Sequence, residues 1–318
     1  MGNVFPGISI VAPSFNQGCF LVKRAPNSKE DKGTKMIERA TIKELPAPPF
    51  GVSGWPWTGV VKPFPTTAWC GDSWPKVSIV TPSYNQGQFL EKTIRSVLLQ
   101  GYPNLEYIII DGGSDDNSVE IIRKYEPWLT YWVSEKDCGQ SHAINKGFSR
   151  AEGALLGWLN SDDWYEPCAL VTVAGFFLEH PGEQVVMGNC NCLDESGTIF
   201  DVVVNHRRNN KELRRYWRGR SIPTQPAMFF TQQLWKKCGP LEEELHLAMD
   251  YDLWLRFSAF CEFQHIDQVI ANYLFHAKAK GGDQNWKKFY PEWRRAYFRR
   301  SKLTQVIYDL PDRLRLGG

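Results

Sequence analysis

Short apolar runs that suit β-strands alternate with segments of helical periodicity between residues 77 and 159. The runs are Val77 to Val80, Glu106 to Ile110, Leu129 to Val133 and Ala154 to Leu159. The segments between them, which repeat apolar residues at helical spacing, are Phe89 to Gln100, Val119 to Tyr125 and Ser141 to Phe148. Because strands that alternate with helices pair in parallel, this order predicts an α/β fold with a mostly parallel central sheet flanked by helices.

Polar clusters follow three of these runs directly. They are Ser83-Tyr84-Asn85, Asp111-Gly112-Gly113 and Ser161-Asp162-Asp163. In open α/β sheets, ligands bind in the crevice outside the carboxyl ends of the strands. We therefore expect the ligand site of this protein at the edge of the sheet where these clusters lie.

The balance of charge and hydrophobicity narrows the class of protein. The 318 residues contain 37 Lys and Arg against 35 Asp and Glu, and this net charge of +2 is not that of a protein whose main partner is nucleic acid. A hydrophobic share of 42% excludes a disordered chain. No stretch reaches the roughly 18 apolar residues that a membrane span requires, and the first residues lack a positively charged leader. We therefore expect a cytoplasmic protein.

Residues 1–75 differ in composition from the rest of the chain and predict a separate N-terminal extension. Prolines and tryptophans, as in Gly54-Trp55-Pro56-Trp57, interrupt regular structure, so we expect an extended arm laid over the domain surface. Within it, Ile8 to Leu21 repeats Val77 to Leu90 at ten of fourteen positions. We interpret this partial repeat as a fragment of a duplicated or fused gene that carries no site of its own.

Residues 281–318 form a basic and aromatic tail that we expect to be helical. Its cations include Lys287, Lys288, Arg294, Arg295, Arg299 and Arg300. A basic amphipathic helix can lie on an anionic membrane surface, which predicts a peripheral contact with the inner face of the membrane and a lipid-linked acceptor. The alternative is a solvated helix that closes the domain.

Adjacent carboxylates mark the end of the fourth strand. Asp162 and Asp163 cannot both point inward, so one of them must lie in the turn that follows. Mg²⁺ and Mn²⁺ are held by one or two carboxylates together with substrate phosphates, so the pair could supply one metal ligand and one acceptor for a sugar hydroxyl. The alternative is a simple turn into the next helix. Asp111-Gly112-Gly113 leaves the same two possibilities open, because glycines let a backbone approach a ligand closely.

A third candidate carboxylate is Asp250, in a segment of helical spacing. Asp250 shares one face of that helix with Leu253 and Trp254, while Asp252 and Arg256 form an i, i+4 pair on another face. A carboxylate at the end of an apolar face has a raised pKa and suits a general base; the alternative is a helix N-cap. Further along, His276 and Lys280 could help to hold a diphosphate or its metal.

Five motifs in order resemble bacterial-type family 2 glycosyltransferases. They are Val77 to Asn85, Ile110 to Asp116, Gly139 to Gly147, Asn160 to Asp163, and Met249 to Asp252. The resemblance covers residues 76–280 and implies a GT-A fold, with a nucleotide-sugar half at 76–180 and an acceptor half at 181–280. It also implies a nucleotide-diphosphate sugar donor, a divalent cation (Mn²⁺ or Mg²⁺) and inversion at the anomeric carbon.

The resemblance also implies a role for particular residues. Thr81 and Tyr84 would lie against the nucleobase with Asp111 nearby, Asp162 would meet the ribose or the donor sugar, Asp163 would bind the metal, and Asp250 would be the catalytic base. Two positions depart from the family pattern. Met249 stands where Glu is usual, and Gly112 stands where many members carry a second acid that reads the base.

These features together predict an inverting glycosyltransferase that acts in the synthesis of a cell-surface or extracellular polysaccharide. Its acceptor would be a glycan or a lipid-linked sugar, with Trp217, Trp235 and Trp254 on the acceptor side for stacking or for the core. One alternative is a non-catalytic relative that binds glycan or partner protein. The other is a nucleotidyltransferase, which would need a Gly-rich basic loop where this chain has Pro82-Ser83-Tyr84-Asn85.

Overall fold

The computed structural model describes residues 40–214, 223–277, 279–280 and 286–300. Trp217 and the partial repeat at residues 8–21 lie outside these residues. The division of the chain into an extension, a domain of two halves and a tail stays a prediction.

The first half of the sheet is parallel throughout and confirms the predicted α/β fold. In chain order its elements are β1 (Val77–Ser83), α1 (Gly87–Leu98), β2 (Leu105–Asp111), α2 (Ser118–Tyr125), β3 (Tyr131–Ser134), α3 (Gln140–Phe148) and β4 (Leu155–Trp158). The strands lie in the order β3-β2-β1-β4. Ser83 is paired with Asp111, and Asp111 with Ser134, so the carboxyl ends of three strands stand in register.

The second half of the sheet mixes parallel and antiparallel pairs. Its elements are β5 (Trp164–Tyr165), α4 (Ala169–Glu179), β6 (Val185–Leu193), β7 (Ile199–Val203), α5 (Asn210–Arg214), β8 (Met228–Thr231), α6 (Gln232–Cys238), α7 (Met249–Phe257), β9 (Gln264–Leu274) and α8 (Trp286–Arg300). The sheet continues from β4 in the order β8-β6-β9-β5, and β7 pairs with β6. Strand β8 is antiparallel to β4 and β6, whereas β9 is parallel to β6.

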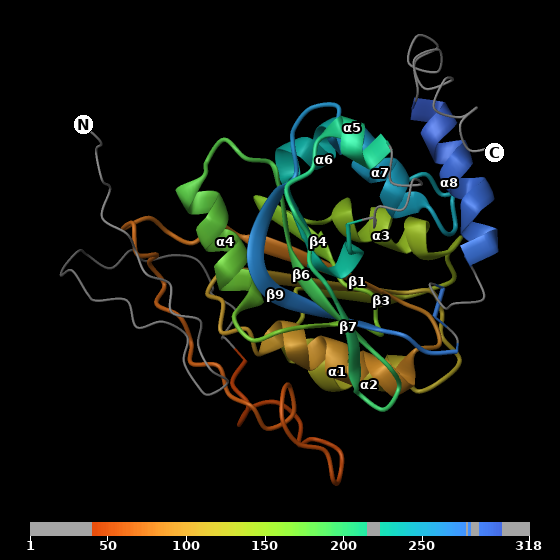
Figure 1. Ribbon diagram of the computed structural model, residues 1–318. Coiled ribbons are helices and arrows are strands. Elements are labelled where there is room, and N and C mark those ends of the chain that lie inside the picture. Colours follow the sequence, from red (N-terminus) through yellow and green to blue (C-terminus); the bar gives the residue numbers. More distant parts are fainter. Residues whose placement is uncertain (1–39, 215–222, 278, 281–285, 301–318) are drawn as a thin grey trace. The chain divides into compact units, whose positions relative to one another are not determined.

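Helices cover both faces of the sheet, with α1 and α2 on one side and α3, α6 and α7 on the other (Figure 1). Successive residues of β1 point to opposite faces: Ile79 belongs to the core with Ile94 of α1, and Val80 to the core with Ile144 of α3. A strand that is buried on both faces reads as a continuous apolar run, which is why the runs of this half were visible in the sequence.

Residues 40–75 contact the domain through buried polar anchors. The Arg95 side chain on α1 is fully buried and donates to the carbonyl oxygens of Pro46 (2.8 Å), Pro56 (3.1 Å) and Trp57 (3.1 Å). The indole nitrogen of Trp55 donates to the Tyr165 carbonyl at 2.7 Å. This segment has no helix or strand of its own, and side-chain contacts hold it in place.

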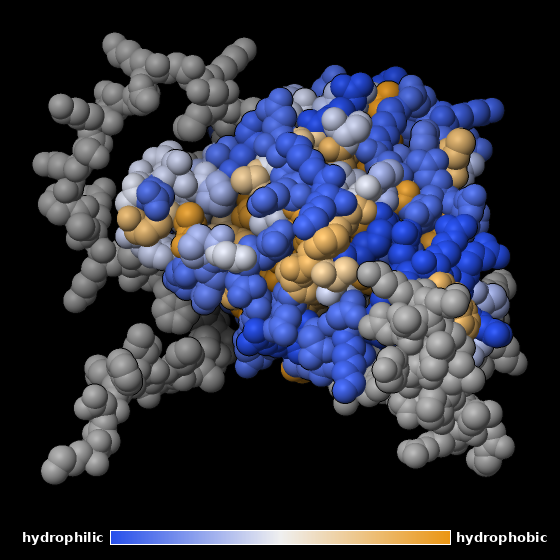
Figure 2. Space-filling model, turned by 90° about the horizontal axis from the view of Figure 1, so that it is seen from above, coloured by the Kyte–Doolittle hydropathy of each residue, from blue (hydrophilic) through white to orange (hydrophobic). Residues whose placement is uncertain are grey.

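The surface is largely hydrophilic where it is seen from the side of α5, α6 and α7, with apolar residues gathered in a patch near the centre of that face (Figure 2). Within the part of the chain that the structure describes, no helix is long and apolar enough to cross a membrane.

Candidate functional site

The loops that follow β1 and β2 are joined by hydrogen bonds. The Ser114 hydroxyl accepts from the backbone N–H of Asn85 (2.8 Å), and the Asn85 side chain accepts from the N–H of Asp115 (2.9 Å). Asp116 accepts from the N–H of Gly87 at 2.9 Å, at the start of α1. Asn85 has a φ of 52°, a left-handed conformation that Asn adopts more readily than most residues. The loops at the ends of β1 and β2 are therefore connected to each other by hydrogen bonds.

Of the three residues that we expected beside the nucleobase, two are buried and already paired. The Thr81 hydroxyl lies 3.1 Å from the Tyr107 hydroxyl, and neither residue is exposed beyond 1%. The Asp111 carboxylate is fully buried and accepts from the Ser114 N–H (2.9 Å), the Ser114 hydroxyl (2.6 Å) and the Ser134 hydroxyl (2.7 Å). Tyr84, by contrast, is 62% exposed. Thr81 therefore joins β1 to β2 and Asp111 holds the loop after β2, whereas Tyr84 is exposed and can meet a ligand.

The adjacent carboxylates Asp162 and Asp163 point in different directions. Asp163 is fully buried and accepts from the Leu274 N–H at 3.2 Å, and burial together with the charge of Asp162 holds its pKa well above the ordinary value. The Asp162 side chain is 18% exposed, and its Oδ2 lies 3.0 Å from Nε2 of His276. Asp162 is therefore the carboxylate of the pair that a ligand can reach.

The turn that carries these carboxylates crosses the sheet. After β4 the chain runs on to β5, where Trp164 pairs with Asn272 of β9, so the end of β9 comes beside the turn. The Thr93 hydroxyl of α1 lies 2.9 Å from the Ser161 carbonyl and 2.7 Å from the Asp163 carbonyl, which fixes the turn against α1. Antiparallel pairing with β9 thus brings His276, two residues beyond that strand, to Asp162.

Asp250 lies in the first turn of α7 and is half-buried. Burial raises the pKa of its carboxyl to about 6, although the Tyr251 N–H, which donates to it at 2.7 Å, and the charge of Lys280 both act to lower that pKa. The N-cap of α7 is Ala248, so Asp250 does not serve as the cap. A carboxyl with a pKa near 6 is ionised at neutral pH and can accept a proton.

A lysine connects the two ends of this site. Lys280 donates to the side chain of Gln140 at 2.7 Å and to the His246 carbonyl at 3.2 Å, and Gln140 donates in turn to Asn160 at 2.7 Å. Burial lowers the pKa of Lys280, while the charges of Glu292, Asp250 and Asp162 raise it. One cation therefore lies within the electrostatic reach of both Asp162 and Asp250.

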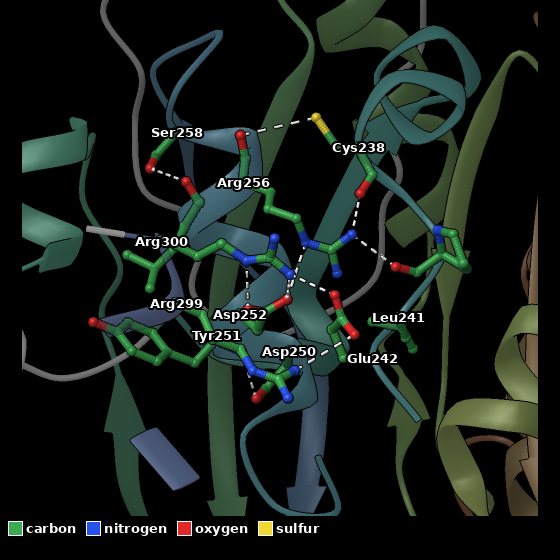
Figure 3. A network of polar contacts seen from close by, with 12 residues as sticks. Cys238, Leu241, Glu242, Asp250, Tyr251, Asp252, Arg256, Ser258, Arg299 and Arg300 are labelled. Carbon is green, nitrogen blue, oxygen red and sulfur yellow. Dashed lines mark hydrogen bonds and ion pairs between the residues drawn. The ribbon is translucent and has the colours of Figure 1, made fainter. Parts of the chain in front are cut away.

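Helix α7 is held by α8 through buried ion pairs. Arg256 and Arg300 converge on Asp252, with nitrogen–oxygen distances of 3.0 Å from Arg256 and of 2.8 and 3.0 Å from Arg300 (Figure 3). The pair between Asp252 and Arg256 confirms the expected i, i+4 contact. Glu292 of α8 accepts from the Leu247 N–H (2.7 Å) and the Ala248 N–H (3.1 Å) at the start of α7. These contacts fix the helix that carries Asp250.

The residues at Asp162 fit a divalent cation of the kind that binds with its substrate. No group of three or more His, Cys, Asp and Glu residues suited to a metal occurs in the described part of the chain. Asp162 and His276 offer a carboxylate and an imidazole, and both are ligands that Mn²⁺ accepts. Two protein ligands suffice where substrate phosphates and water complete the coordination.

Sequence reasoning missed the pairing of His276 with Asp162 and the hydrogen bonds of Lys280 to Gln140 and to the His246 carbonyl. His276 and Lys280 were visible as candidates for a diphosphate, but nothing local in the sequence indicates which carboxylate they meet. The two described tryptophans of the acceptor side, Trp235 and Trp254, pack in or against the core. Trp254 is fully buried and stacks on Trp158 at 5.4 Å, and Trp235 packs against Phe148.

Comparisons with known proteins bear on the family and the fold of this chain. The model of the family described as glycosyl transferase family 2 matches residues 78–238. An uncharacterized glycosyltransferase of Mycobacterium tuberculosis (strain ATCC 25618 / H37Rv) is 32% identical over 204 residues, which are 63% of this chain and 75% of that protein. The chondroitin synthase of Pasteurella multocida (strain Pm70) is 28% identical over 205 residues, 64% of this chain but 21% of the synthase.

Solved structures share the fold at low sequence identity. S. aureus TarS in complex with UDP has a TM-score of 0.57 and 18% identity, over 74% of this chain and 68% of that one. The mannosyltransferase PcManGT from Pyrobaculum calidifontis, in complex with GDP-Man and Mn²⁺, has a TM-score of 0.52 and 19% identity, over 71% of this chain and 64% of that one.

Proposed function

The chain belongs to glycosyl transferase family 2 and has the GT-A fold, and from this premise we propose that it transfers a sugar from a nucleotide-diphosphate sugar to an acceptor hydroxyl with inversion at the anomeric carbon. The observation that carries the proposal is the position of Lys280. It donates to the His246 carbonyl, just before α7 and Asp250, and to Gln140, which donates in turn to Asn160 in the turn that carries Asp162. The donor diphosphate needs positive charge beside Asp162. The acceptor hydroxyl needs a base, which Asp250 supplies.

The donor lies along the carboxyl ends of the strands. The exposed ring of Tyr84 stacks against the nucleobase, and the diphosphate reaches the turn that carries Asp162. Thr81 and Asp111, which the sequence suggested as donor contacts, instead support the site: Thr81 joins β1 to β2, and Asp111 holds the loop after β2. Lys280 contributes a positive charge that attracts the phosphates.

Asp162 and His276 are the residues that hold the divalent cation in this proposal. The metal role expected of Asp163 passes to Asp162, because Asp163 is fully buried and already accepts hydrogen bonds from Leu274 and Asn160. Asp163 instead stabilises the turn through these buried hydrogen bonds. The cation, when bound, neutralises the charge that develops on the leaving diphosphate.

Asp250 acts as the general base. Its carboxylate accepts the proton of the acceptor hydroxyl, whose oxygen forms a bond to the anomeric carbon as the bond from that carbon to the diphosphate oxygen breaks. The nucleoside diphosphate leaves with the bonding electrons, and the attack from the opposite face inverts the configuration. A pKa near 6 keeps Asp250 ionised at neutral pH while leaving it basic enough to take the proton.

For the acceptor, we propose a glycan in the synthesis of a polysaccharide. This proposal is supported by relatives named chondroitin synthase and hyaluronan synthase, of which this chain matches about a fifth. The membrane contact of the tail stays a prediction. Arg299 and Arg300 are engaged with acidic residues of the domain, whereas Arg294 and Arg295 are exposed.

The test is the loss of turnover without the loss of donor binding. Release of nucleoside diphosphate from a panel of nucleotide sugars and glycan acceptors is measured with Mn²⁺, and donor binding is measured by calorimetry. Asp250→Asn should reduce release by about 10² to 10⁴-fold while binding persists. The control is Glu120→Gln, which changes an exposed acid in the first turn of α2. Near wild-type release by Asp250→Asn would show that Asp250 is not the base.

A further inference from the structure

Strand β5 is the last strand of the sheet, so only one of its edges is paired with another strand of the described chain. Tyr165 pairs with Ala271 of β9, and β5 follows β9 in the strand order. Tyr165 is fully buried, and the N–H and carbonyl groups of a buried backbone need hydrogen-bond partners. Because β5 begins directly after Asp163, the groups that hold this strand also hold the turn that carries Asp162 and Asp163.

Two side chains bond to the backbone of Tyr165. The Ser96 hydroxyl on α1 accepts from its N–H at 3.1 Å, and the indole N–H of Trp55 donates to its carbonyl at 2.7 Å. Trp55 belongs to the segment of residues 40–75 and supplies the donor that a further strand would supply. Without this donor the buried carbonyl would be unpaired, which costs more than the loss of an exposed hydrogen bond.

Trp55 is presented by a compact turn. The Gly54 carbonyl accepts from the N–H groups of Trp57 (2.8 Å), Thr58 (2.7 Å) and Gly59 (3.0 Å), and the Thr58 hydroxyl accepts from the Gly54 N–H at 2.9 Å. Helix α1 binds the same turn through the buried guanidinium described above. The backbone on either side of Trp55 is therefore fixed, and the turn holds the indole in one place.

The ring of Trp55 also packs against a small buried cluster. The cluster consists of Trp164, Leu193 and Leu274, and Phe89 of α1 packs against it as well. Leu274 donates its N–H to Asp163 at 3.2 Å, and the ring centroid of Phe89 lies 4.5 Å from that of His276. Members and neighbours of this cluster thus hold Asp163 and His276.

We propose that Trp55 is a positioning residue for the end of the site that Asp162 and His276 form, so that binding of the donor cation depends on the docking of residues 40–75. The indole acts through β5 and does not touch the donor. Without it, β5 and the end of β9 can shift, and the 3.0 Å contact between Asp162 and His276 is no longer maintained. The role of Trp55 in cation binding rests on the proposed function.

The first test is calorimetry of UDP and GDP at increasing Mn²⁺ concentrations. Trp55→Phe keeps an aromatic ring but removes the indole N–H, and it should raise the Mn²⁺ concentration at half-saturation about two- to tenfold, the loss expected of one hydrogen bond. The matched control is Trp74→Phe, which removes a bond of the same kind, from the buried indole of Trp74 to the Pro65 carbonyl at 2.9 Å, just before β1.

Trp74→Phe should lower the melting temperature by about as much as Trp55→Phe but leave the Mn²⁺ requirement unchanged. This comparison separates positioning of the site from stability of the fold. An unchanged Mn²⁺ requirement in Trp55→Phe, or the same rise in both variants, would mean that Trp55 only anchors the segment and would overturn the inference.

The second test is amide hydrogen exchange without any ligand, followed by mass spectrometry in the peptides that contain Tyr165 and Leu274. Trp55→Phe should speed exchange in both peptides, whereas Trp74→Phe should not. Exchange at the wild-type rate in Trp55→Phe would show that the indole does not hold β5. If the wild-type protein binds neither UDP nor GDP with Mn²⁺, the proposed function fails and takes the role of Trp55 in cation binding with it; if it binds and Trp55→Phe matches it, only this inference fails.

Discussion

His276 Nε2 lies 3.0 Å from Oδ2 of Asp162, although 114 residues separate the two in the chain. The contact arises because the segment after β4 crosses to β9 and pairs with it as β5. His276 is itself buried and packs against the ring of Phe89 on α1 at 4.5 Å. The imidazole of His276 and the carboxylate of Asp162 thus form the end of the site that the diphosphate reaches in the proposed function.

His276→Ala should weaken Mn²⁺-dependent binding of a nucleoside diphosphate by at least about tenfold, because one of two protein ligands is lost. The measurement is calorimetry with and without Mn²⁺. His180→Ala, which removes an exposed imidazole at the end of α4, is the matched control and should leave the affinity unchanged. Equal affinities in the two variants would exclude His276 from the cation site.

Turnover should depend on the ionisation of Asp250. Because only the carboxylate can accept a proton, the rate should fall about tenfold for each pH unit below 6, the pKa that burial gives this group. The measurement is release of nucleoside diphosphate between pH 5 and pH 8, at donor concentrations that saturate the site. A rate that stays flat between pH 5 and pH 7 would contradict the assignment.

The raised pKa of Asp250 also affects stability: turnover should rise with pH, whereas the contribution of Asp250 to the free energy of unfolding should fall. The folded pKa of Asp250 is about 6 against an ordinary value of 3.8, so the folded state binds more protons than the unfolded state between these pH values. The contribution of Asp250 to the free energy of unfolding therefore falls as pH rises through this window. Asp250→Asn should remove that part of the pH dependence in urea unfolding.

Arg300→Ala should destabilise the fold by about 1–3 kcal/mol, because the buried carboxylate of Asp252 loses two charge-assisted hydrogen bonds and keeps only Arg256. The free energy of unfolding in urea measures this. Arg295→Ala removes an exposed cation from the same helix and should cost less than about 0.5 kcal/mol. Similar values for the two variants would mean that α8 does not brace α7.

Arg95→Met should release the segment of residues 40–75 from α1. The buried guanidinium donates to three carbonyls of that segment, and a thioether of similar length replaces none of these bonds. We expect a loss of about 2–4 kcal/mol in the free energy of unfolding, together with faster proteolysis between residues 40 and 75. Arg123→Met changes an exposed arginine on α2 and serves as the control. Unchanged proteolysis in Arg95→Met would contradict the anchoring role.

The sequence predicted the half of the fold in which neighbouring elements pack together. Each strand from β1 to β4 lies one helix away from the next, so local patterns carry the information. In the other half the helix that carries Asp250 was predicted, but the strand pairing was not, because β8, β6 and β9 pair across long stretches of chain. Strand β6 also contains Gly188, Asn189 and Asn191, which obscure its apolar pattern.

The sequence predicted candidate residues for the site but not the surroundings of each. The motifs located Asp111, Asp162, Asp163 and Asp250, yet adjacency in sequence cannot tell which of two neighbouring carboxylates is buried. The N–H of Leu274, at the end of β9, donates to the buried Asp163, and His276, two residues further on, meets Asp162. Both depend on pairing with a strand about a hundred residues later. The saturation of Asp111 likewise depends on Ser134 of β3.

The most direct measurement is calorimetry of nucleoside diphosphates with Asp162→Asn and Asp163→Asn, each in Mn²⁺ and in a chelator. The wild-type protein should bind with Mn²⁺ and lose most of its affinity in the chelator. Asp162→Asn should bind weakly in both, whereas Asp163→Asn should stay within about threefold of the wild type, because an amide oxygen can still accept from Leu274 and a buried site disfavours charge. Affinity that does not depend on Mn²⁺, or a loss of affinity confined to Asp163→Asn, would contradict the assignment of the donor cation to Asp162.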